Sequence, residues 1–169
     1  MEFEELLRER YSCRKFTNKE VEKELLDKVL EAGRLAPTAK NQQPFRIYIF
    51  KSEESLKKID QISPCRYGAP VVLGFVYDIN QEWRHPINET NHSGNEDVAI
   101  VATHVMLGAK NVGLDTCWVK MFDNEKFEKI FDLPSNEKSV LIMPLGYGEI
   151  GPAPLHKNKK DISKLVEYR

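Results

Sequence analysis

The sequence predicts an α+β fold in a single domain over residues 1–169. Segments with helical hydrophobic spacing are interspersed with short β-rich runs, without the regular strand–helix–strand units of a doubly wound sheet. The run PVVLGFVYD (70–78) is continuously apolar and rich in β-branched residues, which is typical of a central strand buried on both faces. A chain of 169 residues that is 41% hydrophobic and 30% charged is long enough to build one core unaided.

Before the central strand, the apolar spacing predicts three helices and one strand. The helices cover about 2–10, 21–33 and 52–62, and Ser52 suits the N-cap of the third. The run FRIYIF (45–50) has the aromatic and β-branched composition of a strand.

After the central strand, the strongest helical signal is NEDVAIVATHVMLGAKNVG (95–113), with Gly113 suited to its C-terminal cap. Its apolar residues fall on more than one face, so the helix must be covered on every side. In a domain this small, we expect a second copy of the chain to supply part of that cover. The runs TCWV (116–119) and SVLIMPLGYG (139–148) predict strands, and a helix over about 123–132 separates them.

Composition excludes several classes of function. Lys and Arg total 25 and Asp and Glu total 26, so the net charge of −1 argues against a nucleic-acid surface and against electrostatic membrane binding. The N-terminal MEFEELLRER contains no apolar run that could be a signal or a membrane span. Cys13, Cys65 and Cys117 are widely spaced without a C-x-x-C pair, so we expect neither disulfides nor a zinc ribbon, and we expect a cytoplasmic protein.

Four polar stretches carry the functional signal. In RYSCRKF (10–16), two arginines flank a serine and could grip a phosphate by charge-assisted hydrogen bonds, although a solvated basic turn has the same composition. LAPTAKNQQPF (35–45) offers hydroxyl and amide groups for the edge of a planar polar ring, or it is an ordinary loop. GLDTCWVKMFD (113–123) ends a strand with available backbone N–H groups, and MPLGYGEIGPAPLHKNKKD (143–161) combines glycines with lysines. There is no P-loop, and no G-x-G-x-x-G joins a strand to a following helix, which disfavours a classical dinucleotide fold.

Together and in this order, the four stretches resemble the FMN-dependent nitroreductase family over nearly the whole chain. The resemblance implies a sandwich with a central, mostly antiparallel sheet flanked by helices, in an intertwined homodimer with FMN at the subunit interface. The residues it implies as cofactor-binding are Arg10, Tyr11, Ser12, Arg14, Pro37, Thr38, Asn41, Val119, Lys120, Met121, Gly146, Lys157 and Lys159.

The resemblance also assigns roles within that set. The 10–14 stretch would hold the FMN phosphate and ribityl chain, with Lys157 and Lys159 closing on the phosphate. The 37–41 segment would line the flavin, and the backbone of 119–121 would pass the flavin N5 edge.

The implied reaction is a ping-pong hydride transfer in which NAD(P)H reduces FMN and a small acceptor, such as a nitroaromatic or a quinone, then takes the electrons. Flavin N5 carries that chemistry, so no catalytic side chain is expected. A flavin-binding carrier or sensor without turnover would share the same cofactor residues. An unrelated phosphate-binding module, in which the four stretches never converge, is the third interpretation.

The polar segment 80–94 is too long for a simple connector. It contains His85 and His92, but their spacing matches no known ligand set, so we predict no metal site. We interpret 83–92 as a flap over the flavin.

Overall fold

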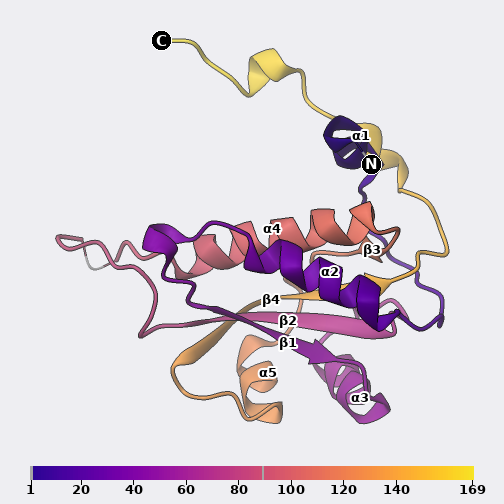
Figure 1. The fold of residues 1–169 in the computed structure, drawn as a ribbon, viewed down its shortest axis with the longest axis horizontal. Helices are drawn as coiled ribbons and strands as arrows, with labels where there is room; N and C mark the ends of the chain where they lie inside the picture. The colour runs from indigo at the N-terminus through magenta and orange to yellow at the C-terminus, as the bar shows by residue number, and fades with distance from the viewer. Residues whose placement is uncertain (1, 89) are drawn as a thin grey trace.

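The computed structural model describes residues 2–88 and 90–169 and confirms an α+β architecture with an antiparallel sheet flanked by helices (Figure 1). The sheet has four strands in the order β1-β2-β4-β3, and every neighbouring pair is antiparallel. The strands are β1 (Phe45–Phe50), β2 (Val71–Asp78), β3 (Asp115–Thr116) and β4 (Glu137–Gly146).

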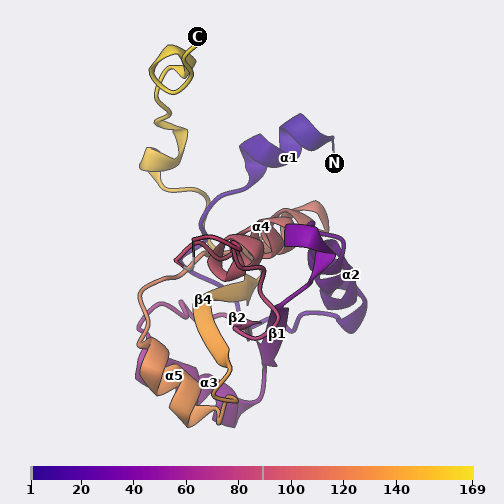
Figure 2. The same ribbon diagram turned by 90° about the vertical axis from the view of Figure 1, so that its left-hand side faces the viewer.

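Helices cover both faces of this sheet. Figures 1 and 2 show α2 (Lys23–Arg34) and α4 (Gly94–Asn111) over one face, and α3 (Glu53–Ile62) and α5 (Asn124–Ile130) over the other. The helices that the sequence predicts in these regions are therefore confirmed.

Local capping signals fix where several helices begin and end. The Ser52 hydroxyl accepts a hydrogen bond from the Ser55 N–H at 3.2 Å, and the Asp123 carboxylate accepts from the Lys126 N–H at 3.0 Å. Gly113 follows α4 with a φ of 84°, as expected for a C-terminal cap.

The central strand β2 is buried on both faces, as its apolar run predicts. Its alternate side chains enter two separate cores because successive strand residues face opposite sides of a sheet. Leu73 and Phe75 pack with α2 and α4, whereas Val72 and Val76 pack with Phe127 of α5 and its neighbours.

The strand predicted over 116–119 is wrong in its bounds, because β3 covers only Asp115–Thr116. The chain continues beside β4, where the Cys117 N–H donates to the carbonyl of Pro144 at 3.2 Å. Because proline has no N–H, Pro144 cannot return the second hydrogen bond, and the ladder is interrupted there. β4 itself covers 137–146, whereas the sequence pattern predicts 139–148.

The N-terminal helix and the start of the C-terminal segment lie near each other, away from the sheet (Figure 1). Figure 1 shows α1 (Phe3–Glu9) beside the short turn η2 (Pro154–Lys157), beyond the C-terminal end of α4. The His156 ring lies 3.4 Å from the Arg8 carbonyl, and the chain then continues through η3 (Ile162–Lys164). No helix among residues 2–88 and 90–169 combines the length and the apolar character needed to cross a membrane.

Candidate functional site

The segment 10–17 is fixed in an extended course by its backbone. The Cys13 N–H donates to the carbonyl of Thr116 at 2.9 Å, and the Phe16 N–H donates to that of Tyr67 at 3.0 Å. The Thr17 N–H donates to Tyr147 at 2.9 Å. These bonds use main-chain groups only, so the Ser12 and Arg14 side chains stay available.

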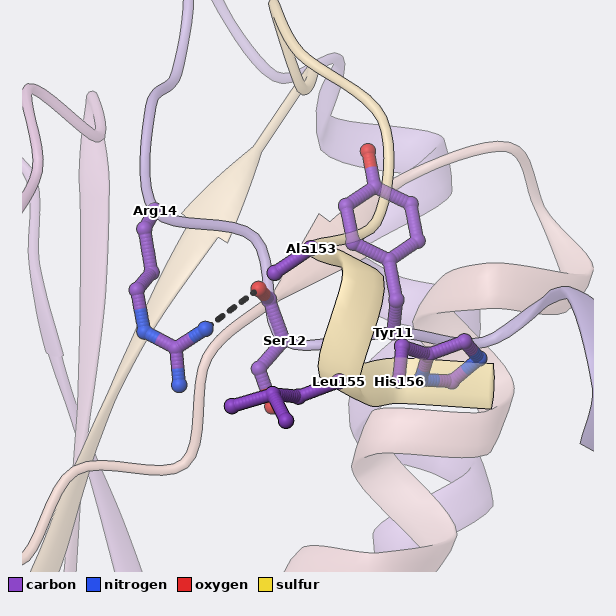
Figure 3. A pocket seen from close by; sticks show the side chains of 6 residues that line it. All are labelled: Tyr11, Ser12, Arg14, Ala153, Leu155 and His156. Carbon is purple, nitrogen blue, oxygen red and sulfur yellow. Dashed lines mark hydrogen bonds between the residues drawn. The ribbon is translucent and has the colours of Figure 1, made fainter. Parts of the chain in front are cut away.

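Ser12 and Arg14 line one pocket of about 340 Å³ (Figure 3). Arg14 lies on one side of it and the rings of Tyr11 and His156 on the other, with Ser12 and Leu155 between them. The Arg14 guanidinium lies 3.5 Å from the Ser12 carbonyl, which is at most a weak hydrogen bond.

The Arg14 guanidinium at this pocket has no carboxylate partner among the described residues. Across residues 2–88 and 90–169, neither Arg10 nor Arg14 forms an ion pair with a carboxylate, and the Ser12 hydroxyl has no hydrogen-bond partner. An unpaired guanidinium beside a free hydroxyl is suited to an anion with several acceptor oxygens, such as a phosphate.

A second pocket, of about 150 Å³, adjoins the first through Arg14. It is lined by Arg14, by a turn after α3 that contains Cys65 and Tyr67, and by the segment 117–121. Three of the four predicted stretches, 10–16, 113–123 and 143–161, therefore converge on the two pockets that share Arg14.

Hydrogen bonding distinguishes the residues of 119–121. Both main-chain groups of Val119 bond to Ile142, at 3.0 and 3.1 Å, and the Lys120 ammonium donates to the Val140 carbonyl. In the described parts of the chain, the N–H groups of Lys120 and Met121 donate no hydrogen bond. These two amides can therefore serve a ligand in the second pocket.

Lys157 and Lys159 line a third pocket, of about 740 Å³, between α1 and the C-terminal segment. Tyr11 and His156 line both this pocket and the first one. The two lysines thus share a pocket with Tyr11, whereas Arg14 lines the other two pockets. Gly146 lines none of the three pockets: a Cβ there would lie 2.8 Å from Pro70, so this glycine allows the sheet to pack closely.

The segment with Pro37, Thr38 and Asn41 lies elsewhere. It includes the short turn η1 (Ala39–Asn41), whose Ala39 N–H donates to Asp97 in the first turn of α4 at 2.8 Å. Ser12, by contrast, pairs with Thr116, beyond the other end of α4. An 18-residue helix is about 27 Å long, so the two groups of predicted residues lie at opposite ends of α4 (Figure 1). One copy of the chain does not bring them together.

Known proteins resemble this chain in both sequence and fold. The family model "Nitroreductase family" matches residues 7–65 and 65–147. The chain belongs to the nitroreductase family. A nitroreductase family protein of Clostridium difficile 630 is 33% identical, with a TM-score of 0.94 over 99% of this chain and 98% of that one.

Two further nitroreductase relatives are more distant. An FMN-dependent nitroreductase of Clostridium difficile R20291 is 25% identical, with a TM-score of 0.78 over 96% of each chain. A candidate NADH dehydrogenase/NAD(P)H nitroreductase of Methanothermobacter thermautotrophicus is 27% identical over 161 residues, which cover 90% of this chain and 80% of that protein.

Tyr11 of this nitroreductase forms part of one side of the first pocket (Figure 3). Its hydroxyl donates to the Ile150 carbonyl at 2.8 Å and lies 3.2 Å from the Asp115 carboxylate. Burial and the negative charge of Asp115 raise the pKa of Tyr11, so it stays a neutral donor. A Cβ on Gly148 would lie 2.6 Å from Asp115 and 2.7 Å from the Tyr11 hydroxyl, which explains why that position has no side chain.

Three residues that line the second pocket, Cys65, Tyr67 and Cys117, are not among the predicted site residues. Tyr67 and Cys65 come from a turn about 50 residues from Arg14, and Cys117 comes from the end of β3. Burial raises the pKa of the Cys117 thiol, with Arg14 acting in the opposite direction, so the thiol is neutral near pH 7. The one local signal is Tyr67–Gly68, a tyrosine–glycine pair in which both residues have positive φ.

In this nitroreductase the segment 80–94 lies at the same end of α4 as η1. Arg84 and His92 form a bridge, and the Ser93 N–H donates to the Trp83 carbonyl at 2.9 Å. The His85 ring accepts hydrogen bonds from the N–H groups of residues 87 and 88. The described residues contain no group of side chains suited to a metal ion. A flap role for 83–92, part of which lies outside the described residues, stays a prediction.

Proposed function

We propose that this protein binds FMN and uses it to transfer hydride from NAD(P)H to a small acceptor such as a nitroaromatic or a quinone. The observation that supports it best is the position of Arg14. Its side chain lines both the pocket of Ser12 and the pocket of 117–121, so one cation borders a place for a phosphate and a place for a ring. The nitroreductase of Clostridium difficile R20291, named as FMN-dependent, supports the choice of cofactor.

The residues present fit such a cofactor. Ser12 and Arg14 offer a hydroxyl and an unpaired guanidinium for the phosphate and the polar chain next to it. The free N–H groups of Lys120 and Met121 offer donors for the edge of a flavin ring. When bound, FMN would supply the hydride chemistry at N5, and the protein would bind, orient and shield the reactants.

The positive charge at Arg14 has a second use in this proposal. When bound, FMN would gain negative charge at one edge of its ring on accepting hydride, and a fixed cation close to that edge would stabilise this charge. Arg14 is the cation that both pockets share. No side-chain nucleophile or base is required, which agrees with neutral thiols at Cys13 and Cys117.

We further propose that the site is completed in a homodimer, with FMN at the subunit interface. Pro37, Thr38 and Asn41 are an α4 length away from Arg14 in one chain, so a second copy must bring them to the same flavin. Apolar side chains for an interface are exposed on α1 and on the C-terminal segment, at Leu7 and Ile162 among others. The proposed protein is a single-domain cytoplasmic enzyme.

Visible absorption of the purified protein tests this function. We expect flavin bands that bleach anaerobically when NADPH or NADH is added and that return when a nitroaromatic or a quinone follows. Flavin bands that persist with both donors would favour a carrier or sensor without turnover. A protein that takes up no flavin, even after reconstitution with FMN, would contradict the proposal.

A further inference from the structure

The loop 38–43 has an unusual backbone. Lys40, Asn41 and Gln43 have φ angles of 50°, 57° and 52°, and they are three of the five non-glycine residues with positive φ in the described chain. This left-handed conformation costs conformational energy for residues with a side chain. Such a conformation persists only where surrounding contacts impose it. The contacts of this loop with its surroundings therefore determine its conformation.

One buried carboxylate ties the loop to the body of the protein. The Asp97 Oδ1 accepts from the Ala39 N–H at 2.8 Å, and the residue is only 2% exposed. The other bonds of the loop are internal: the Gln43 N–H donates to the Thr38 hydroxyl at 3.1 Å, and the Gln43 amide donates to the Asn41 carbonyl. Among the described residues, the bond to Asp97 is the one hydrogen bond that joins 38–43 to another element.

Asp97 is itself held rigidly. Its Oδ2 accepts from the Ser93 hydroxyl at 2.7 Å, and that hydroxyl in turn accepts from the Trp83 N–H at 3.1 Å. The Gly94 N–H donates to the carboxylate of Glu82, whose side chain is 1% exposed. A Cβ at Gly94 would lie 2.3 Å from the ring of Tyr77 in β2, so the start of α4 packs directly against β2.

We propose that Asp97 is a positioning residue, which fixes Thr38 and Asn41 against the flavin ring without touching the flavin. The inference rests on the proposed function, because it takes 37–41 as the ring-lining segment. Beyond that function, a carboxylate on α4 sets the conformation of this segment through the Ala39 N–H. The consequence is that the ring side of the site depends on Asp97, whereas the phosphate side depends on Arg14.

FMN and riboflavin distinguish the contribution of the ring side of the site from that of the phosphate side. Riboflavin has the ring and the ribityl chain of FMN but lacks the phosphate. We expect Asp97→Ala to weaken the binding of FMN and the binding of riboflavin by the same factor, about tenfold, because only ring contacts are lost. Arg14→Ala should instead weaken FMN more than riboflavin. The dissociation constants are measured by flavin fluorescence on the full chain, so no turnover is required.

Ser93→Ala is the matched control. It removes the other hydrogen bond of the same carboxylate and leaves the Ala39–Asp97 bond in place. We expect it to lower the melting temperature without changing either dissociation constant. Asp97→Asn retains an oxygen that can accept from Ala39 and should recover most of the flavin affinity.

Ala39→Pro covers the case in which Asp97→Ala does not fold. Proline removes the donor of the same bond from the loop side and is tolerated at the first position of a helical turn. We expect equal losses of FMN and riboflavin affinity. If the wild type binds FMN and every folded variant of Asp97 or Ala39 binds both flavins as tightly as Ser93→Ala, the inference is wrong. If the wild type binds no FMN, the proposed function fails first.

Discussion

Arg14 is the residue on which most of the proposed site depends. It lines two adjoining pockets and forms no ion pair within the described residues. A guanidinium that is left unpaired on a folded protein is free to bind an anionic ligand, and charge-assisted bonds of this kind are stronger than neutral ones.

We expect Arg14→Ala to weaken FMN binding by about 10- to 100-fold, because a hydrogen bond to a charged group contributes about 1.5–3 kcal/mol. Lys15→Ala is the control: it removes the next cation along the chain, but that lysine pairs with Glu149 at 2.7 Å on the exposed surface. FMN titrations of both variants, with melting curves to verify folding, make the comparison. Equal FMN affinity in Arg14→Ala and the wild type would remove the phosphate assignment.

At the residue scale, the sequence shows which side chains could bind a ligand, but it does not show which distant residues lie beside them in the fold. Arg14 and Ser12 can be selected from RYSCRKF because cation and hydroxyl lie close in the chain. Tyr67 and Cys65 cannot, because a fold contact through the Phe16–Tyr67 bond brings them to Arg14. Nor does the sequence show that Lys157 and Lys159 line a different pocket from Arg14.

The helices and strands follow closely from local signals. The central strand, the 45–50 strand and the cap at Ser52 are correct because each depends on neighbouring residues alone. The bounds of β3 are wrong because they depend on Pro144, a residue of the facing strand. Prediction fails where the pairing partner decides the outcome.

The extended segment 10–17 gives a prediction for alkaline pH. Burial raises the pKa of Cys13 above the 9.0 of a free thiol, and it does the same for Cys117 next to that segment. The folded state therefore holds these protons where the unfolded chain has released them. By linkage, stability is complete below about pH 9 and falls as the pH rises beyond it.

Thermal unfolding at about pH 8 and about pH 10 measures this loss. The double variant Cys13→Ala/Cys117→Ala should lose less stability between the two pH values than the wild type, although its stability at the lower pH is reduced by the small cavities. The same pH-dependent loss in both proteins would show that other groups, such as the buried Tyr11, dominate the alkaline transition.

At the scale of the whole molecule, one chain neither brings the two groups of predicted site residues together nor covers α4 on every side. The sequence shows that α4 is apolar on more than one face, and the structure covers it with α2 and the sheet on one side. Ile100 on α4 stays 38% exposed. The same helix separates Thr38 from Ser12. A partner copy that packed on α4 would therefore both cover its exposed face and bring a second Thr38 to Ser12.

We expect a homodimer that does not dissociate at low micromolar concentration, measured by sedimentation. Ile100→Glu should yield monomers, because a charge on α4 would be buried without a partner at the interface. Those monomers should bind FMN weakly, since the 37–41 segment of a second copy is lost. Ile49→Glu is the control: Ile49 lies on β1, is 41% exposed, and should leave a dimer with normal FMN affinity. A wild-type monomer that holds FMN tightly would contradict the interface site, because it would show that one chain completes the pocket without Thr38 and Asn41 of another.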